Sequence, residues 1–216
     1  MIFLASSSPR RKKLLKEAGV IFRSICPDYD EKQSVGATRR VAPTPSVFVK
    51  KHAFAKAASC VSRVKEGVIL GSDTVVYFSG RVIGKPKNHA DAFKILTLLQ
   101  GRWHVVYTGV AILHIKHSRM VKKIVFSERT RVRLRAMDRM AIESYFKKIN
   151  PLDKAGAYAI QSDEVNIITD VKGSIANAIG LPIERMTAWV GNASKDPLLP
   201  LWFRGKWQGR RRRERP

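Results

Sequence analysis

The sequence predicts an α/β protein in which a mixed β-sheet is flanked by helices. Three observations lead to this fold class. Strand-like and helix-like stretches alternate irregularly along the 216 residues, which favours a layered α/β fold. Two long β-like stretches, 104–115 and 122–134, are joined by a polar turn, as in a hairpin. Hydrophobic residues make up 44% of the chain, enough for a substantial core. The hairpin makes a mixed sheet a better match than a purely parallel one.

The first element is a short apolar strand at Ile2–Leu4, followed by a serine-rich turn and a helix. Ser8 suits the N-cap of that helix, and Pro9 suits its first position, where a missing N–H costs nothing. Apolar residues then recur at helical spacing, and Gly19 stands where the helix is expected to stop.

The later elements follow from apolar runs and from capping or turn residues between them. Asn88 and Asp138 are each expected to cap a helix, the first from His89 to Leu99 and the second through Phe146. The remaining predictions are a strand at 20–25, a helix at 47–61, a strand at 68–77 interrupted at 71–74, a hairpin turn at 78–81 leading into 82–84, strands at 157–160 and 165–171, and a helix at 182–190.

The net charge of +24 is unusually high and favours anionic partners, either nucleotides or nucleic acid. Residues 204–215 hold seven basic residues against one acid, and residues 116–148 hold eleven against three. We predict one domain over 1–194 and a basic, mobile tail over 195–216, with weak polyanion binding by the tail.

The cysteines and the apolar segments favour a cytoplasmic protein. Cys26 and Cys60 have no metal-ligand spacing and are expected to be buried, reduced thiols. No apolar run is long enough to span a membrane, and no signal peptide is apparent.

The serine-rich turn has the composition of an anion site. Arg10 and Arg11 stand on the first helical turn, where the helix dipole disfavours cations. A phosphate held jointly by Ser6, Ser8 and the two guanidinium groups would make this arrangement favourable. A solvated basic face is the alternative, and the turn alone does not decide between them.

Asp73 is the most conspicuous candidate for catalysis, because it interrupts an apolar strand where an unpaired carboxylate would be costly to bury. Lys85 follows across a hairpin turn and could reach the same edge, and Glu31 could add a second carboxylate for a divalent cation. Such a set suits hydrolysis of a triphosphate: the acid positions water or metal, and the lysine neutralises phosphoryl oxygens. The alternative is a strand-end aspartate bonded to a neighbouring turn.

Other common catalytic patterns are missing from the sequence. It contains no Walker A loop, no GxGxxG and no GxSxG, and its five histidines have no metal-ligand spacing. Gln161, at the end of the polar stretch DKAGAYAIQ, could recognise a base edge through its amide.

Together these stretches resemble the Maf family of nucleoside triphosphate pyrophosphatases, once called septum formation inhibitors. The resemblance covers about Met1 to Trp189 and rests on LASSSPRR, the Asp30-Glu31 pair, GSDTVV, GKP, DAFKILTLLQGRWHVVYTGV, DKAGAYAIQ and NAIGLP. It implies a curved mixed sheet of the inosine triphosphate pyrophosphatase kind, a cleft site, a divalent cation (Mg or Mn) and a homodimer. The implied reaction converts a nucleoside triphosphate to the monophosphate and pyrophosphate.

The resemblance also implies roles for individual residues. Asp73 is the proton acceptor, Glu31 is a metal or water partner, and the phosphate contacts are Arg10, Arg11 and Lys85. The dTTP/UTP subtype carries an Arg, a Thr and a Gln at the places that are Arg10, Thr74 and Gln161 here. Ser162, where the family has glycine, is a departure that bears on substrate preference. The two alternatives are a 7-methyl-GTP pyrophosphatase and a basic nucleic-acid-binding or cell-division regulatory protein that keeps the fold without catalysis.

Overall fold

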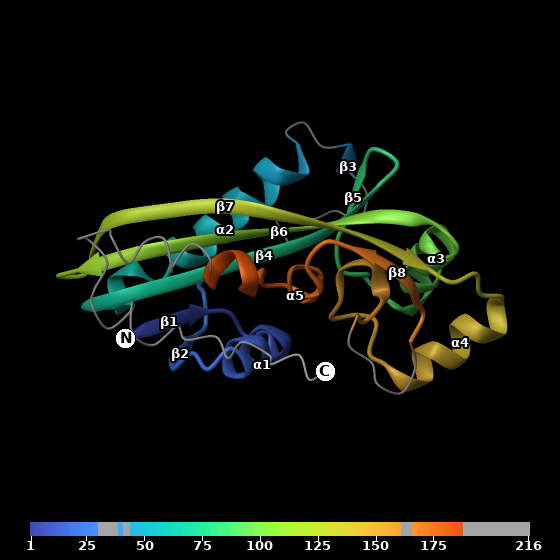
Figure 1. Cartoon of the computed structure of the whole chain (residues 1–216), viewed down its shortest axis with the longest axis horizontal. Coiled ribbons are helices and arrows are strands. Elements are labelled where there is room, and N and C mark those ends of the chain that lie inside the picture. Colours follow the sequence, from blue (N-terminus) through green and yellow to red (C-terminus); the bar gives the residue numbers. More distant parts are fainter. Residues whose placement is uncertain (30–38, 41–43, 161–165, 188–216) are drawn as a thin grey trace, which may run out of the picture.

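The computed structural model describes residues 1–29, 39–40, 44–160 and 166–187, and within them it shows a mixed sheet flanked by helices (Figure 1). The α/β prediction is therefore confirmed. The strands are β1 Ile2–Ala5, β2 Phe22–Ile25, β3 Arg39–Arg40, β4 Glu66–Phe78, β5 Arg81–Ile83, β6 Trp103–Lys116, β7 Arg119–Leu134 and β8 Ile168–Lys172. The α-helices are α1 Pro9–Glu17, α2 Pro45–Ala58, α3 His89–Leu99, α4 Arg139–Lys148 and α5 Ile175–Ile179; 3₁₀ turns lie at Val61–Arg63 and Ala155–Ala157.

The eight described strands form one sheet with the order β2-β1-β4-β6-β7-β8, while β5 pairs with β4 and β3 pairs with β5. β1 runs parallel to both β2 and β4, and the other pairs are antiparallel. β6 and β7 form the predicted hairpin, which pairs from Trp103↔Arg133 to Lys116↔Arg119. The three long strands β4, β6 and β7 give the molecule its elongated shape (Figure 1).

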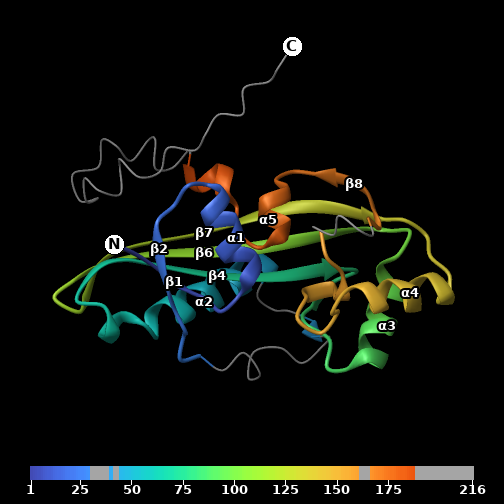
Figure 2. The same ribbon diagram turned by 90° about the horizontal axis from the view of Figure 1, so that it is seen from below.

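Helix α2 covers one face of the long strands, and two glycines let it approach closely. A Cβ at Gly71 or Gly109 would collide with the backbone carbonyls of Ala53 or Val49 in α2. Helices α1 and α5 lie against the opposite face (Figures 1 and 2), where Leu15 is fully buried. Because these two glycines lack a Cβ, α2 lies close enough for its side chains to reach β4.

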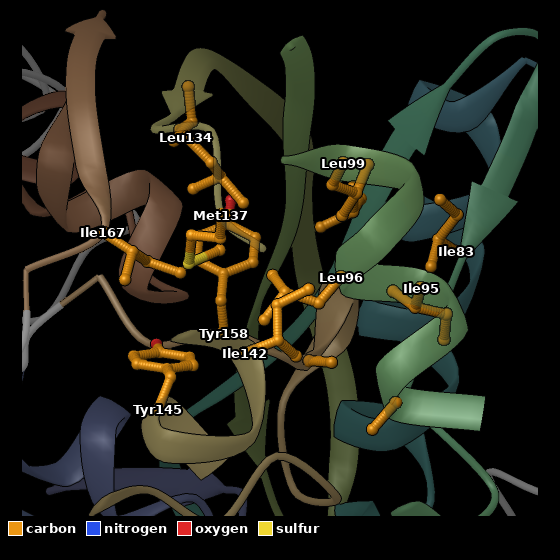
Figure 3. Close-up of a cluster of buried hydrophobic side chains, with 14 of the residues drawn as sticks. Ile83, Ile95, Leu96, Leu99, Leu134, Met137, Ile142, Tyr145, Tyr158 and Ile167 are labelled. Atoms are coloured by element: carbon orange, nitrogen blue, oxygen red, sulfur yellow. The ribbon is translucent and has the colours of Figure 1, made fainter. Parts of the chain in front are cut away.

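A second apolar cluster fills the other end of the molecule, between α3, α4 and the sheet (Figure 3). Tyr145 and Tyr158 point into it alongside Met137 and Ile167. Each tyrosine hydroxyl has a polar partner: that of Tyr145 accepts the Ala159 N–H at 2.9 Å, and that of Tyr158 lies 2.7 Å from His104 Nε2. Burial raises the pKa of both phenols. These bonds anchor the segment that follows Asp153.

Several sequence predictions are confirmed closely. Asn88 Oδ1 accepts the Asp91 N–H at 2.8 Å and caps α3, and Asp138 Oδ1 accepts the Ala141 N–H at 2.7 Å and caps α4. β1, α1 and the β4–β5 hairpin lie within two residues of their predicted bounds. The final helix is seen at 183–187, and its remainder lies outside the described residues.

Other predictions are wrong. Residues 157–160 are not a strand, because Gly156 and Ala157 adopt φ values of 77° and 62° and turn the chain. β4 is not interrupted at 71–74, because β6 pairs with it throughout. Cys26 is exposed rather than buried, although both cysteines are free thiols. The short helix α5 was not expected.

Two further predictions concern residues that the structure does not describe. The tail lies within 188–216, outside the described residues, so its mobility and the boundary at 194 stay predictions.

Among the helices that are described, none has the length and apolarity needed to cross a bilayer.

Candidate active site

The site is organised around a gap in the sheet beside β4. β1 pairs with β4 only as far as Ala5↔Gly71, and β5 pairs with it only from Val76↔Ile83. Residues 72–75 therefore have a strand neighbour on the β6 side and none of the described strands on the other. An interruption of this kind leaves backbone groups and alternating side chains accessible from the sheet edge.

On one side of the gap, Asp73 forms an ion pair that the sequence did not predict. The Lys56 ammonium of α2 donates to Asp73 Oδ1 at 2.6 Å, and the two side chains are 5% and 15% exposed. Lys56 belongs to the buried stripe of α2, with Ala53 one turn before it and Cys60 one turn after it. A lysine inside an apolar stripe is the signal that could have revealed it, since a buried ammonium requires a partner.

On the other side, Arg11 is held by three oxygen acceptors. Its Nε donates to the Gly180 carbonyl at 2.9 Å, its Nη1 to Ser6 Oγ at 3.3 Å, and its Nη2 to Thr74 Oγ1 at 3.1 Å. Ser6 Oγ also accepts the N–H of Ser8 at 3.2 Å. The serine-rich turn, α1 and β4 thus meet through one guanidinium group, and the binding of an anion there stays a prediction.

Thr74 continues this network into the sheet. Thr108 Oγ1 lies 3.0 Å from Thr74 Oγ1 and donates its proton to the Asn177 carbonyl at 2.8 Å. Since the Thr108 proton is used there, Thr74 must be the donor between the two hydroxyls. The hydrogen bonds therefore run in one direction from Arg11 through both threonines to Asn177.

Arg10 has a different partner from Arg11. Its Nη1 lies 3.0 Å from Asp153 Oδ2, and its Nη2 donates to the Asp153 carbonyl, also at 3.0 Å. Burial by itself would raise the pKa of Asp153, but the nearby Lys154 and Arg10 hold this pKa below its usual value. Arg10 thereby ties α1 to the segment around Asp153.

Lys85 follows the end of β5 by two residues. β5 pairs with β4 only as far as Ile83↔Val76, at the border of the gap. Gly84, just before Lys85, accepts a hydrogen bond from the Gly156 N–H at 3.1 Å. The Lys85 side chain is exposed, and the expectation that it reaches the same edge as Asp73 stays a prediction.

The structure thus brings Ser6, Arg11, Thr74 and Asp73 to the two sides of one gap, and Lys85 follows the strand that borders it. Ser8 and Arg10 lie at its α1 border. Arg10 and Thr74 are not bonded to each other, because Arg11 takes the position beside Thr74. Glu31 and Gln161 lie outside the described residues.

Comparison with known proteins shows the family of this chain. The family model described as "Maf-like protein" matches residues 1–193. The chain belongs to the Maf family. Its relatives named "dTTP/UTP pyrophosphatase" include one from Dictyoglomus thermophilum, 37% identical over 187 residues, with 87% of this chain and 93% of the relative covered. A second, from Pelotomaculum thermopropionicum, is 39% identical over 185 residues, with 86% of this chain and 92% of the relative covered.

A relative of the same name from Bacillus cereus is also 39% identical over 185 residues, with 86% of this chain and 91% of the relative covered. Among solved structures, a nucleoside-triphosphatase (dITP/XTP pyrophosphatase) from Mycobacterium abscessus has a TM-score of 0.36 and 17% identity. The structural match covers 62% of this chain and 72% of the Mycobacterium abscessus chain. A score of this size supports no inference, and the Maf assignment rests on the family match and the sequence relatives.

The metal-ligand donors at the gap suit a divalent cation that enters the site already bound to the phosphates of a nucleotide. In the described part of this Maf-family chain, no group of three His, Cys, Asp or Glu side chains is arranged to hold a metal ion. Asp73, next to Thr74 in β4, presents a carboxylate whose Oδ1 is bonded to Lys56. One or two carboxylates together with phosphate oxygens are the usual ligands of Mg²⁺, so this donor set suits a magnesium–nucleotide complex.

Proposed function

We propose that this chain hydrolyses nucleoside triphosphates to the monophosphate and pyrophosphate, with dTTP and UTP as preferred substrates. The observation that carries the proposal is the gap beside β4, where Asp73 and its Lys56 partner border one side and the Arg11–Thr74 network borders the other. A carboxylate for proton transfer and fixed cationic donors for phosphate oxygens are the two requirements of this hydrolysis. Membership of the Maf family and the names of the relatives point to the same reaction.

The proposed mechanism assigns each group a step. A water molecule attacks the phosphoanhydride that joins the α- and β-phosphates, and its proton passes to the Asp73 carboxylate. Lys56 holds that carboxylate in place, because its ammonium lies 2.6 Å from Oδ1. The anhydride P–O bond breaks and pyrophosphate leaves with the bond's electron pair. Arg11, Ser6 and Lys85 contact the phosphate oxygens, with Arg10 and Ser8 at the border.

A divalent cation, Mg²⁺ or Mn²⁺, is part of this proposal. When bound, it supplies positive charge that offsets the charge of the triphosphate. The candidates for its protein ligands are Asp73 and Glu31, because one or two carboxylates with phosphate oxygens are the usual ligands of Mg²⁺.

The preference for dTTP and UTP rests on the names of the relatives and on Arg10, Thr74 and Gln161. A glutamine amide can pair with the adjacent carbonyl and N–H of uracil or thymine, and an unpaired group on either side costs ~1–3 kcal/mol when buried. Gln161→Glu removes the donor and adds a charge, so kcat/KM for dTTP should fall more than that for 7-methyl-GTP. A wild type that already prefers 7-methyl-GTP, or unchanged ratios in the variant, would place the chain in the other subtype.

The deciding experiment for the reaction is the identity of the products. The chain is incubated with dTTP, UTP, CTP or 7-methyl-GTP and Mg²⁺ or Mn²⁺, and pyrophosphate and orthophosphate are measured separately. Pyrophosphate with the matching monophosphate is expected. Orthophosphate in its place would overturn the reaction, and no turnover of any nucleotide would favour a non-catalytic protein on the same fold.

Three further properties belong to the same proposal. Free thiols at Cys26 and Cys60 agree with a reducing compartment, and we assign the chain to the cytoplasm. The family resemblance supports a homodimer, which sedimentation would test. The arginines at 210–213 support salt-sensitive polyanion binding by the tail. Deleting the tail should leave turnover at saturating substrate unchanged, and a loss of turnover would contradict this assignment.

A further inference from the structure

A row of three arginines lies on β7, apart from the residues assigned to hydrolysis. Arg129, Arg131 and Arg133 alternate with Thr130 and Val132, so the arginines share one face of the strand. All three are exposed, whereas Thr130 and Val132 are completely buried on the opposite face. Alternate residues of a strand are about 6.8 Å apart. On the neighbouring strand β8, Lys172 pairs with Arg131 and adds a fourth cation.

Within the described residues, no acidic side chain forms an ion pair with the arginine row. In the ranges that the structure describes, none of the three arginines forms an ion pair or a side-chain hydrogen bond. Asp170 pairs with Arg133 across the strands, yet no ion pair joins their side chains. Unneutralised like charges at this spacing repel one another, which makes an anionic partner favourable.

Aromatic residues run beside the arginines. In the β6–β7 register, Trp103 pairs with Arg133 and Tyr107 pairs with Arg129, and both rings are half-buried. The Arg131 guanidinium lies 5.0 Å and the Lys172 ammonium 5.3 Å from the Trp103 ring centroid. These cations are thus held by an aromatic ring instead of a carboxylate.

Helix α2 leaves this part of the face open. The helix begins at Pro45, and Ser46 Oγ lies 2.7 Å from Ser127 Oγ, two residues before Arg129. The arginines therefore start where the described part of the helical layer ends, and Arg131 and Arg133 lie in the part of β7 that pairs with β8. Figure 1 shows these two strands side by side.

We propose that this arginine–aromatic surface (Arg129, Arg131, Arg133, Lys172, Trp103 and Tyr107) binds single-stranded nucleic acid. The arginine row contacts successive phosphates, and bases stack against Trp103 and the adjacent guanidinium plane. A stacking platform beside a line of cations is a general solution for single strands, whose bases are exposed. A second copy of this chain is a poor occupant of the surface, since it would bring a protein of net charge +24 against a row of cations.

The test compares two full-length variants of equal net charge. One carries R129Q, R131Q and R133Q, and the other carries K16Q, K94Q and K148Q, three exposed lysines on helices. Binding of a fluorescein-labelled single-stranded DNA of about 12 nucleotides is followed by anisotropy over a range of salt concentrations. Loss of three phosphate contacts should make the slope of log K against log salt shallower by about 2 and weaken binding at least tenfold. The lysine variant should change much less.

Two more variants separate stacking and folding from charge. W103L should weaken binding of the oligonucleotide about tenfold and leave binding of inorganic polyphosphate unchanged, because polyphosphate has no bases. The variant R129K/R131K/R133K retains the charge and should recover most of the affinity. Turnover of the nucleotide substrate should stay at the wild-type level throughout, which reports an intact fold; if the triple glutamine variant does not fold, R131Q alone is measured in its place.

Several results would overturn the proposal. Equal losses in the arginine and lysine variants would indicate binding by overall charge alone. Polyphosphate that competes as well as the oligonucleotide, with no effect of W103L, would indicate a phosphate surface without base contacts. Tighter binding of duplex than of single strand would exclude the stacking geometry. A change of oligomeric state in the arginine variant, with oligonucleotide binding intact, would assign the surface to contacts between copies of the chain.

Discussion

Asp73 and Thr74 are neighbours in β4, but their side chains lie on opposite faces of the sheet and meet different chemistry. Asp73 faces α2 and forms a largely buried ion pair with Lys56. Thr74 faces α1 and α5 and joins a chain of hydroxyl and carbonyl groups with Arg11 at its open end. Because the sheet is interrupted beside both residues, we propose that one substrate contacts both faces.

The two faces also differ in how their buried polar groups are stabilised. On the Asp73 face, two opposite charges offset each other's desolvation. On the Thr74 face, Thr108 and Asn177 are buried and neutral, with the Arg11 guanidinium at the open end, and His104, on the same face of β6 as Thr108, follows this pattern. Burial lowers the pKa of His104 to about 4, so its imidazole is neutral at physiological pH. We infer that the Asp73 face governs proton transfer and that the Thr74 face governs positioning of the substrate.

The largest effect is expected from Asp73→Asn, which keeps the shape of the side chain and removes the proton acceptor. Turnover should fall between about 10²- and 10⁴-fold, with a much smaller change in KM. Pyrophosphate release at saturating dTTP is the measurement. Glu143→Gln, an exposed acid on α4, is the matched control and should stay close to wild-type turnover. A D73N variant whose defect lies mainly in KM would contradict the division between the two faces.

Lys56→Met should have the largest effect on stability. It leaves the Asp73 carboxylate, only 15% exposed, without its ammonium partner, and breaking a buried pair costs about 4 kcal/mol. Urea unfolding of the single variants and of K56M/D73N would give the coupling between the two groups. The double variant should recover part of the loss, because the neutral amide needs no counter-charge. A K56M variant within about 1 kcal/mol of wild type would show that the pair contributes little.

His104, on the Thr74 face, should make the free energy of unfolding depend on pH. Between pH 6.5 and about 4, the unfolded chain binds a proton on this imidazole that the folded chain excludes. The free energy of unfolding is therefore highest above pH 6.5 and falls as the pH is lowered, by about 3 kcal/mol in total at pH 4. Unfolding at a series of pH values is compared with His104→Gln, which does not titrate and can still bond Tyr158. Equal pH dependence in both proteins would contradict this assignment.

Predictions from the sequence succeeded where a few adjacent residues decide the structure. Helices α3 and α4 begin as expected because Asn88 and Asp138 supply the capping oxygens themselves. Local composition was misleading at 71–74, where glycine, serine and aspartate resemble a break. Pairing with β6, more than thirty residues later in the chain, keeps that segment extended.

Individual site residues could be predicted from the sequence, but the contacts between them could not. Asp73, Lys85 and Arg11 were identified from their motifs. The structure places Asp73 and Arg11 beside one gap, and Lys85 lies two residues after the strand β5 that borders it. The Lys56–Asp73 pair was missed, because it depends on the approach of α2 to β4 that Gly71 and Gly109 permit. The Gly180 carbonyl was missed for a similar reason: no side chain marks a backbone acceptor, although Arg11 Nε and Ser72 Oγ both bond it, at 2.9 Å and 3.0 Å.

The smallest predicted effect comes from a substitution on the Thr74 face and tests the role of that face directly. Thr74→Val keeps the side-chain volume and deletes the hydroxyl that accepts from Arg11 Nη2 and donates to Thr108 Oγ1. Both partners lose one bond, which costs about 1.4 kcal/mol and corresponds to a roughly tenfold rise in KM for dTTP. Turnover should change by no more than about twofold, because the Lys56–Asp73 pair on the other face is untouched. Thr74→Ser retains the hydroxyl and should keep KM close to the wild-type value. If Thr74→Val instead lowered turnover as far as Asp73→Asn with KM unchanged, the two faces of β4 would share one role.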